Sequence, residues 1–146
     1  MKTISLNIKP HIAEWLNSQF SHNGVIVLKP KSFLFSALVS ELKTYSDNNK
    51  IYTSTKTNCV FALPFWIKKH RSINMYITPK GVLNFQRKAE WMFWADAERF
   101  IINARRQNIS IVDAAFGFIE QNNISSISVD AIVKFFYRIR IQKKKC

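Results

Sequence analysis

Residues 82–106 constrain the fold most, because they predict one long helix that is apolar on two sides. Thr78 and Pro79 are suited to the start of this helix, and Asn108 tolerates the left-handed backbone that ends one. At about 3.6 residues per turn, one face carries Phe85, Ala89, Met92, Phe93, Phe100 and Ala104. The other carries Leu83, Trp91, Trp94, Ala97, Ile101 and Ile102. Such a helix is expected to be covered on both sides, at the centre of a fold or of a dimer.

The charge of the chain predicts a polyanionic partner. The net charge is +13, from 22 Lys and Arg against 9 Asp and Glu, whereas solubility needs a magnitude of only about 2–8. A nucleic acid is the usual partner of such a surface, although a ribosome, a membrane or a capsid would also suit it. With 47% hydrophobic residues, the 146-residue chain is expected to fold as one domain with a buried core.

The periodicity of the apolar residues predicts an α+β fold with two halves, an α+β half over residues 1–78 and a helical half over 79–146. The first half is expected to begin as a β-α-β-α unit, with strands over 3–9 and 25–28 and helices over 10–21 and 32–45. The polar segment 46–58 predicts a loop.

A β-hairpin is expected next, formed by the apolar run 59–67 and the alternating residues 73–78. Its tip would be basic, with Lys68, Lys69, His70 and Arg71. Such a tip could contact the minor groove or the backbone of DNA, or it could simply be a hydrated turn.

The end of the chain predicts a pair of helices. Ser110 and Asp113 indicate the capped start of a helix to Asn122, whose inner face would carry Ile111, Val112, Ala115, Phe118 and Ile119. Ser128 can cap a last helix to about Gln142. A bracing helix followed by a basic one is typical of helix–turn–helix units. Here the turn is longer than usual and lacks glycine, and Gly117 instead lies inside the first helix, where close packing is its expected use.

The last helix provides the main candidate contacts to nucleic acid. Its buried arc would be Val129, Ile132, Val133, Phe135, Phe136 and Ile139. Phosphate contacts are expected from Lys134, Arg138, Arg140, Lys143, Lys144 and Lys145, and base contacts from Tyr137 and Arg138. Lys68, Lys69 and Arg71 are secondary candidates, as are Lys88, Arg99 and Arg106 on the long helix. The alternatives are a solvated terminal helix with Asp130 and Lys134 paired, and a solvent-exposed strip on the long helix.

No catalytic or metal site is predicted, so neither an enzyme nor a cofactor is expected. His11, His22 and His70 are scattered, and no phosphate-binding loop or cluster of acids is present. Cys59 and Cys146 suggest neither a disulfide framework nor a zinc site. Trp91, Phe93 and Trp94 are expected in the core rather than stacked on bases. A signal peptide and a run of about 20 apolar residues are both missing from the sequence, so we expect a cytoplasmic protein without a membrane partner.

Four segments resemble a group of small basic proteins from phages and other mobile elements of Bacteroidetes-type bacteria. These are Ile8-Lys9-Pro10, Leu28-Lys29-Pro30-Lys31-Ser32, Asn84-Phe85-Gln86-Arg87 and residues 130–140. The resemblance implies an origin in a mobile element and no particular activity. Together these features predict a dimeric DNA-binding regulator or accessory factor. The alternatives are an RNA-binding accessory protein and a non-enzymatic protein that binds an acidic host protein.

Overall fold

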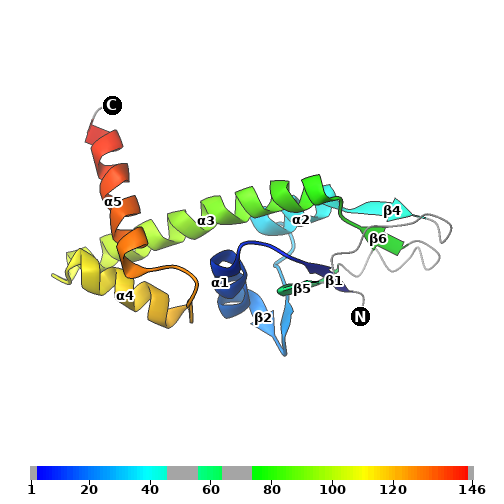
Figure 1. Cartoon of the computed structure of the whole chain (residues 1–146), viewed down its shortest axis with the longest axis horizontal. Helices are drawn as coiled ribbons and strands as arrows, with labels where there is room; N and C mark the ends of the chain where they lie inside the picture. The colour runs from blue at the N-terminus through cyan, green and yellow to red at the C-terminus, as the bar shows by residue number, and fades with distance from the viewer. Residues whose placement is uncertain (1–2, 46–55, 64–73, 145–146) are drawn as a thin grey trace. The chain divides into compact units, whose positions relative to one another are not determined.

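The computed structural model describes residues 3–45, 56–63 and 74–144, and the chain divides into two compact units, Met1–Glu90 and Trp91–Cys146 (Figure 1). The boundary lies inside the long helix α3 (Pro79–Arg106). Both helices and a small mixed sheet are present, so the fold is α+β, as predicted. Besides the start of α3, the first unit contains β1 (Thr3–Leu6), α1 (Pro10–Phe20), β2 (Ser21–His22), β3 (Val25–Ile26), α2 (Phe33–Glu41), β4 (Lys43–Tyr45), β5 (Cys59–Ala62) and β6 (Asn74–Tyr76).

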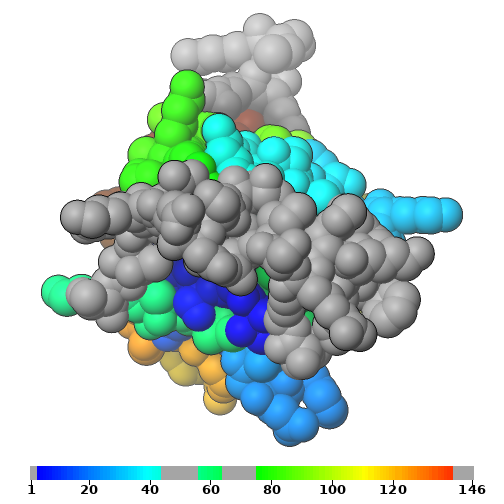
Figure 2. All heavy atoms as spheres, turned by 90° about the vertical axis from the view of Figure 1, so that its right-hand side faces the viewer, coloured from blue at the N-terminus to red at the C-terminus, as the bar shows by residue number. Residues whose placement is uncertain are grey.

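The main sheet of the first unit has the strand order β1-β5-β3-β2. β1 is antiparallel to β5, with Leu6 opposite Cys59, and β3 is parallel to β5, with Ile26 opposite Phe61. Figure 2 shows the dark-blue atoms of β1 among the blue-green atoms of β5. Leu6, Ile26, Cys59 and Phe61 are all buried, so the core lies on one side of this sheet.

A tight turn at Asn23-Gly24 joins β2 to β3. Both residues have positive φ angles, 52° and 81°, which is the combination that a type I′ hairpin turn requires. The pair Asn-Gly is itself the sequence signal for such a turn.

The predicted hairpin between residues 59–67 and 73–78 is wrong. β5 pairs with β1 and β3, whereas β6 pairs with β4 in a separate two-stranded sheet. β6 finds this partner because α2 ends at Glu41, before the predicted Tyr45, and Leu42 has an extended backbone. The proposed basic tip, Lys68, Lys69, His70 and Arg71, lies outside the described residues.

The long helix α3 begins at Pro79 and ends at Arg106, and the Oγ1 of Thr78 accepts a hydrogen bond from the N–H of Gly81 at 3.0 Å. Its buried residues follow one stripe with a spacing of three or four, namely Phe85 and Ala89 in the first unit and Phe93, Ala97, Ile101 and Ala104 in the second. The prediction of a second buried apolar face on α3 is therefore wrong. Ala97 and Ile101 belong to the buried stripe, whereas Leu83, Ile102 and Trp91, which is 67% exposed, face solvent.

In the second unit, α3 is followed by α4 (Ile111–Gln121) and α5 (Val129–Lys144), and Figure 1 shows α4 running back along α3. Phe118 of α4 packs edge-on against Phe93 and Phe100, with ring centroids 5.6 and 5.7 Å away. α5 in turn packs against α4. Ser110 caps α4 as predicted, because its Oγ accepts a hydrogen bond from the N–H of Asp113 at 3.1 Å.

α3 and α4 both end with an asparagine in the left-handed conformation. Asn108 has a φ of 64°, as the sequence predicted, and the N–H of Ile109 donates to the carbonyl of Ala104 at 3.1 Å. Asn123 has a φ of 52°, and the N–H of Ile124 donates to the carbonyl of Ile119 at 3.0 Å. These are Schellman endings, which turn the chain sharply and set the paths into α4 and α5.

Two helical glycines have different packing environments. A Cβ atom at Gly117 would lie 3.6 Å from the ring of Phe100, an ordinary van der Waals contact, so the expected need for glycine there is wrong. A Cβ atom at Gly81 would lie 2.8 Å from Cγ2 of Ile77 and 3.0 Å from Oε2 of Glu41, which is too close without movement of both neighbours.

We therefore expect opposite effects from the same substitution at these two positions. Gly117→Ala should raise the free energy of unfolding by about 0.5–1 kcal/mol, because alanine favours a helix interior. Gly81→Ala should lower it, because the clash with Ile77 outweighs that gain. Urea denaturation of both variants measures the effects. Equal stabilisation by the two would contradict the packing described at the start of α3.

Candidate nucleic-acid interface

α5 is held in one orientation by a cap and an apolar side. The Oγ of Ser128 accepts a hydrogen bond from the N–H of Ala131 at 3.1 Å, as predicted. Ile132 is fully buried and Phe136 is 6% exposed. The ring of Phe135 stacks on Trp94 of α3 with centroids 4.2 Å apart. These contacts fix which side of α5 faces the core.

The opposite side of α5 presents Lys134, Tyr137 and Arg138 to solvent, with Tyr137 49% exposed. The three residues lie at positions i, i+3 and i+4, so they share one face of the helix within about one turn. The structure thus brings together three of the predicted contact residues. Arg140, Lys143, Lys144 and Lys145 lie outside the described side chains.

Lys134 forms an ion pair with Asp130, and its Nζ lies 3.0 Å from Oδ2 of the aspartate. This is the pairing that the alternative interpretation of α5 predicted. Both side chains are more than two-thirds exposed, and such a pair contributes only roughly 0.3–0.5 kcal/mol on a helix surface. The ion pair does not involve Arg138, which stays exposed. Lys134 can exchange its aspartate partner for a phosphate at little cost in free energy.

The other predicted basic residues within the described part lie on α3. Lys88 is exposed on α3 but belongs to the first unit, so no common surface with α5 is established. Arg99 and Arg106 are exposed in the second unit and lie on one side of α3, seven residues apart. Lys68, Lys69 and Arg71 lie outside the described residues.

The outer face of α4 has a different character from that of α5. It carries the exposed acids Asp113 and Glu120, together with Val112 and Phe116, each 57% exposed. Val112 was expected inside, but the buried stripe follows Ile111, Ala114, Ala115 and Phe118 instead. Phe116 was not predicted as a surface residue, although its spacing from Asp113 and Glu120 places all three on one face.

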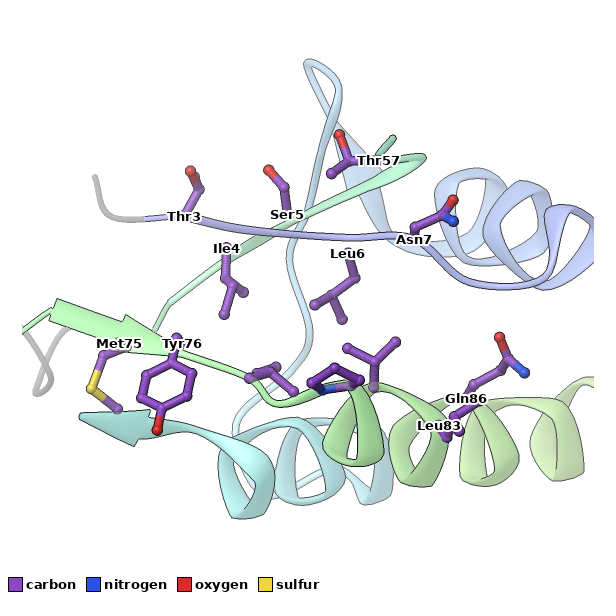
Figure 3. A pocket seen from close by; sticks show the side chains of 13 residues that line it. Thr3, Ile4, Ser5, Leu6, Asn7, Thr57, Met75, Tyr76, Leu83 and Gln86 are labelled. Atoms are coloured by element: carbon purple, nitrogen blue, oxygen red, sulfur yellow. The ribbon is translucent and has the colours of Figure 1, made fainter. Parts of the chain in front are cut away.

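The first unit contains a groove of about 550 Å³ between β1, β6 and the start of α3. In Figure 3, Ile4 and Leu6 point from β1 toward β6 and α3, while Thr3 and Ser5 point the other way. The residues that line the groove are apolar or neutral, and none carries a formal charge. It therefore lacks the cationic groups that a phosphate site uses.

The pKa values of His11 and Cys59 depart from their ordinary range. Burial lowers the pKa of His11, Lys9 lowers it further, and Glu90 and Glu14 act in the opposite direction. Burial raises the pKa of Cys59 to about 12, so it stays a protonated thiol and a poor nucleophile. No group of three or more acidic, histidine or cysteine side chains suited to a metal ion occurs among residues 3–45, 56–63 and 74–144.

Comparisons with protein-family models, with curated proteins and with solved structures gave no significant match. Within the described part of the chain, no helix is long and apolar enough to cross a membrane.

The lowered pKa of His11 predicts a pH dependence of stability. Because the folded state holds this pKa below 6.5, the unfolded chain takes up the proton first as the pH falls, and stability decreases below about that pH. The free energy of unfolding should therefore drop more between pH 7.5 and 5.5 in the wild type than in His11→Gln. Exposed His22 provides the control His22→Gln. An identical pH profile for the wild type and His11→Gln would contradict the assignment.

Proposed function

We propose that this protein is a DNA-binding regulator or accessory factor of a phage or mobile element, and that it contacts duplex DNA with the exposed face of α5. The observation that supports this most strongly is the grouping of Lys134, Tyr137 and Arg138 on the solvent side of a capped helix. Its other side is fixed by Ile132, Phe135 and Phe136. A braced helix with a rigid cationic face is the arrangement that enters a DNA groove in helix–turn–helix proteins.

Each side chain of this face has a distinct role in the proposal. Lys134 exchanges its exposed aspartate partner for a phosphate and releases a counterion. Arg138 offers a planar fork of donors, which suits a phosphate or the edge of a guanine. Tyr137 is 49% exposed, and its hydroxyl would contact a base edge or a sugar. A long-range contribution comes from the net charge of +13, which attracts the duplex.

The acids of α4 indicate which side of the helix pair the duplex approaches. Asp113 and Glu120 are exposed on the outer face of α4, and no Lys or Arg occurs between residues 107 and 133. A polyanion is repelled by such a face. The duplex in our proposal therefore contacts α5, while α4 acts as the brace.

The proposal predicts salt-dependent binding that requires the α5 face. Fluorescence polarisation should show binding to duplex DNA that weakens steeply from 50 to 200 mM salt, because phosphate contacts release counterions. Lys134→Glu with Arg138→Glu should reduce affinity by roughly tenfold or more, since two contacts become repulsive. Thermal unfolding should change little, because both side chains are exposed.

A matched control separates this local effect from the loss of total charge. Lys29→Glu with Lys31→Glu changes the net charge equally at two exposed positions of the first unit and should retain most of the affinity. Equal losses in the two double variants, or unchanged binding by the α5 variant, would refute the α5 interface. Preferential binding to structured RNA would favour the RNA-binding alternative, and no binding to any nucleic acid would favour an acidic protein partner.

A further inference from the structure

The charges of this protein are segregated along the chain in a way that DNA binding alone does not explain. Residues 107–133 contain none of the 22 Lys and Arg residues but three of the nine acids. The exposed part of this segment includes the outer face of α4. This face is apolar and acidic, whereas the protein as a whole is strongly cationic.

The α4 stripe consists of Asp113, Phe116 and Glu120, with Val112 beside Phe116. Positions i, i+3 and i+7 of a helix lie on one face, so the two acids flank the aromatic ring at either end. Phe116 and Val112 are each 57% exposed. An exposed aromatic residue between charged neighbours is typical of the centre of a protein–protein interface.

The α3 stripe has the same layout with the opposite charge. It consists of Arg99, Asn103 and Arg106, with Ile102, 36% exposed, beside Asn103. Its two arginines are seven residues apart, as are the two acids of the α4 stripe. Within the described residues, no ion pair joins the two stripes.

Both stripes border one groove of about 350 Å³ between α3 and α4. Asn103 lines the groove from the α3 stripe, and Asp113 lines it from the α4 stripe. Phe100, Ala104 and Gly117 contribute apolar surface to its floor and walls. The basic stripe, the groove and the acidic stripe therefore lie next to one another on the second unit.

We propose that a second copy of this chain docks on this surface, so that the α4 stripe of each copy packs against the α3 stripe of the other. In a two-fold symmetric interface, a contact from one stripe to the other is made twice. Asp113 and Glu120 of one copy then face Arg99 and Arg106 of the other. Because each stripe has like charges at both ends, the two acids can pair with the two arginines whether the helices run parallel or antiparallel.

The apolar residues and the opposite charges of the two stripes favour a second copy as the occupant. Phe116 and Val112 would be removed from water over Ile102 of the other chain, which provides the hydrophobic part of the association. Two copies that each carry a charge of +13 repel one another elsewhere. At the two stripes, attraction between opposite charges offsets part of this repulsion. This dimer leaves the α5 face open and does not depend on the proposed DNA contact.

Charge reversal provides the test, with sedimentation velocity of the full chain as the measurement. The wild type should sediment as a dimer. Asp113→Lys with Glu120→Lys should weaken dimerisation at least tenfold, and so should Arg99→Glu with Arg106→Glu, because each places like charges opposite one another. The quadruple variant should restore the dimer. Lys134→Glu with Arg138→Glu should remain dimeric whether or not it binds DNA, which separates this proposal from the proposed function.

Two results would overturn the proposed interface. One is a wild type that remains monomeric at concentrations up to 100 µM, which would leave the surface to a different, basic protein. The other is a dimer that persists in either double variant or is not restored in the quadruple variant. Circular dichroism confirms that each variant is folded. If a reversal unfolds the chain, Asp113→Asn with Glu120→Gln replaces it, with weaker dimerisation as the expected result and unchanged dimerisation as the contradicting one.

Discussion

The arrangement of the second unit depends on aromatic packing along α3. Phe118 of α4 is 1% exposed and contacts Phe93 and Phe100, and Phe135 of α5 stacks on Trp94. Removal of a buried phenylalanine ring of this kind costs about 3–5 kcal/mol. Because these rings determine which side of each helix is inside, they also determine which side is outside. The exposed groups of α4 and α5 are therefore held on a rigid scaffold.

Two surfaces of opposite character result from this packing. α5 presents Lys134, Tyr137 and Arg138, which suit a polyanion, whereas α4 presents Asp113, Phe116 and Glu120, which suit a protein. Both helices belong to one compact unit, so a dimer formed through α3 and α4 would present two α5 faces at a fixed separation. Linking two binding sites in this way increases affinity for one duplex without any new contact.

Local signals predicted the helices well, but the sequence could not predict which strands pair. The caps at Ser110 and Ser128 and the left-handed Asn108 act within one turn, so residue type alone indicates them. One partner of β5 is β1, more than 50 residues away, and no local pattern specifies such a pairing. The periodicity of the apolar residues likewise suggested two apolar faces for α3. It did not indicate that one of these faces would be exposed to solvent. The exposed residues of α5 were predicted, whereas Phe116 was missed because apolar residues were assigned to the core.

Amide chemical shifts measured during titration with a short DNA duplex would locate the DNA contact surface, since the 17.1 kDa chain is small enough for residue-level NMR. We expect the largest shift changes at Lys134, Tyr137 and Arg138, with little change along the outer face of α4. Changes concentrated on Asp113, Phe116 and Glu120, or confined to the first unit while α5 stays unchanged, would contradict it.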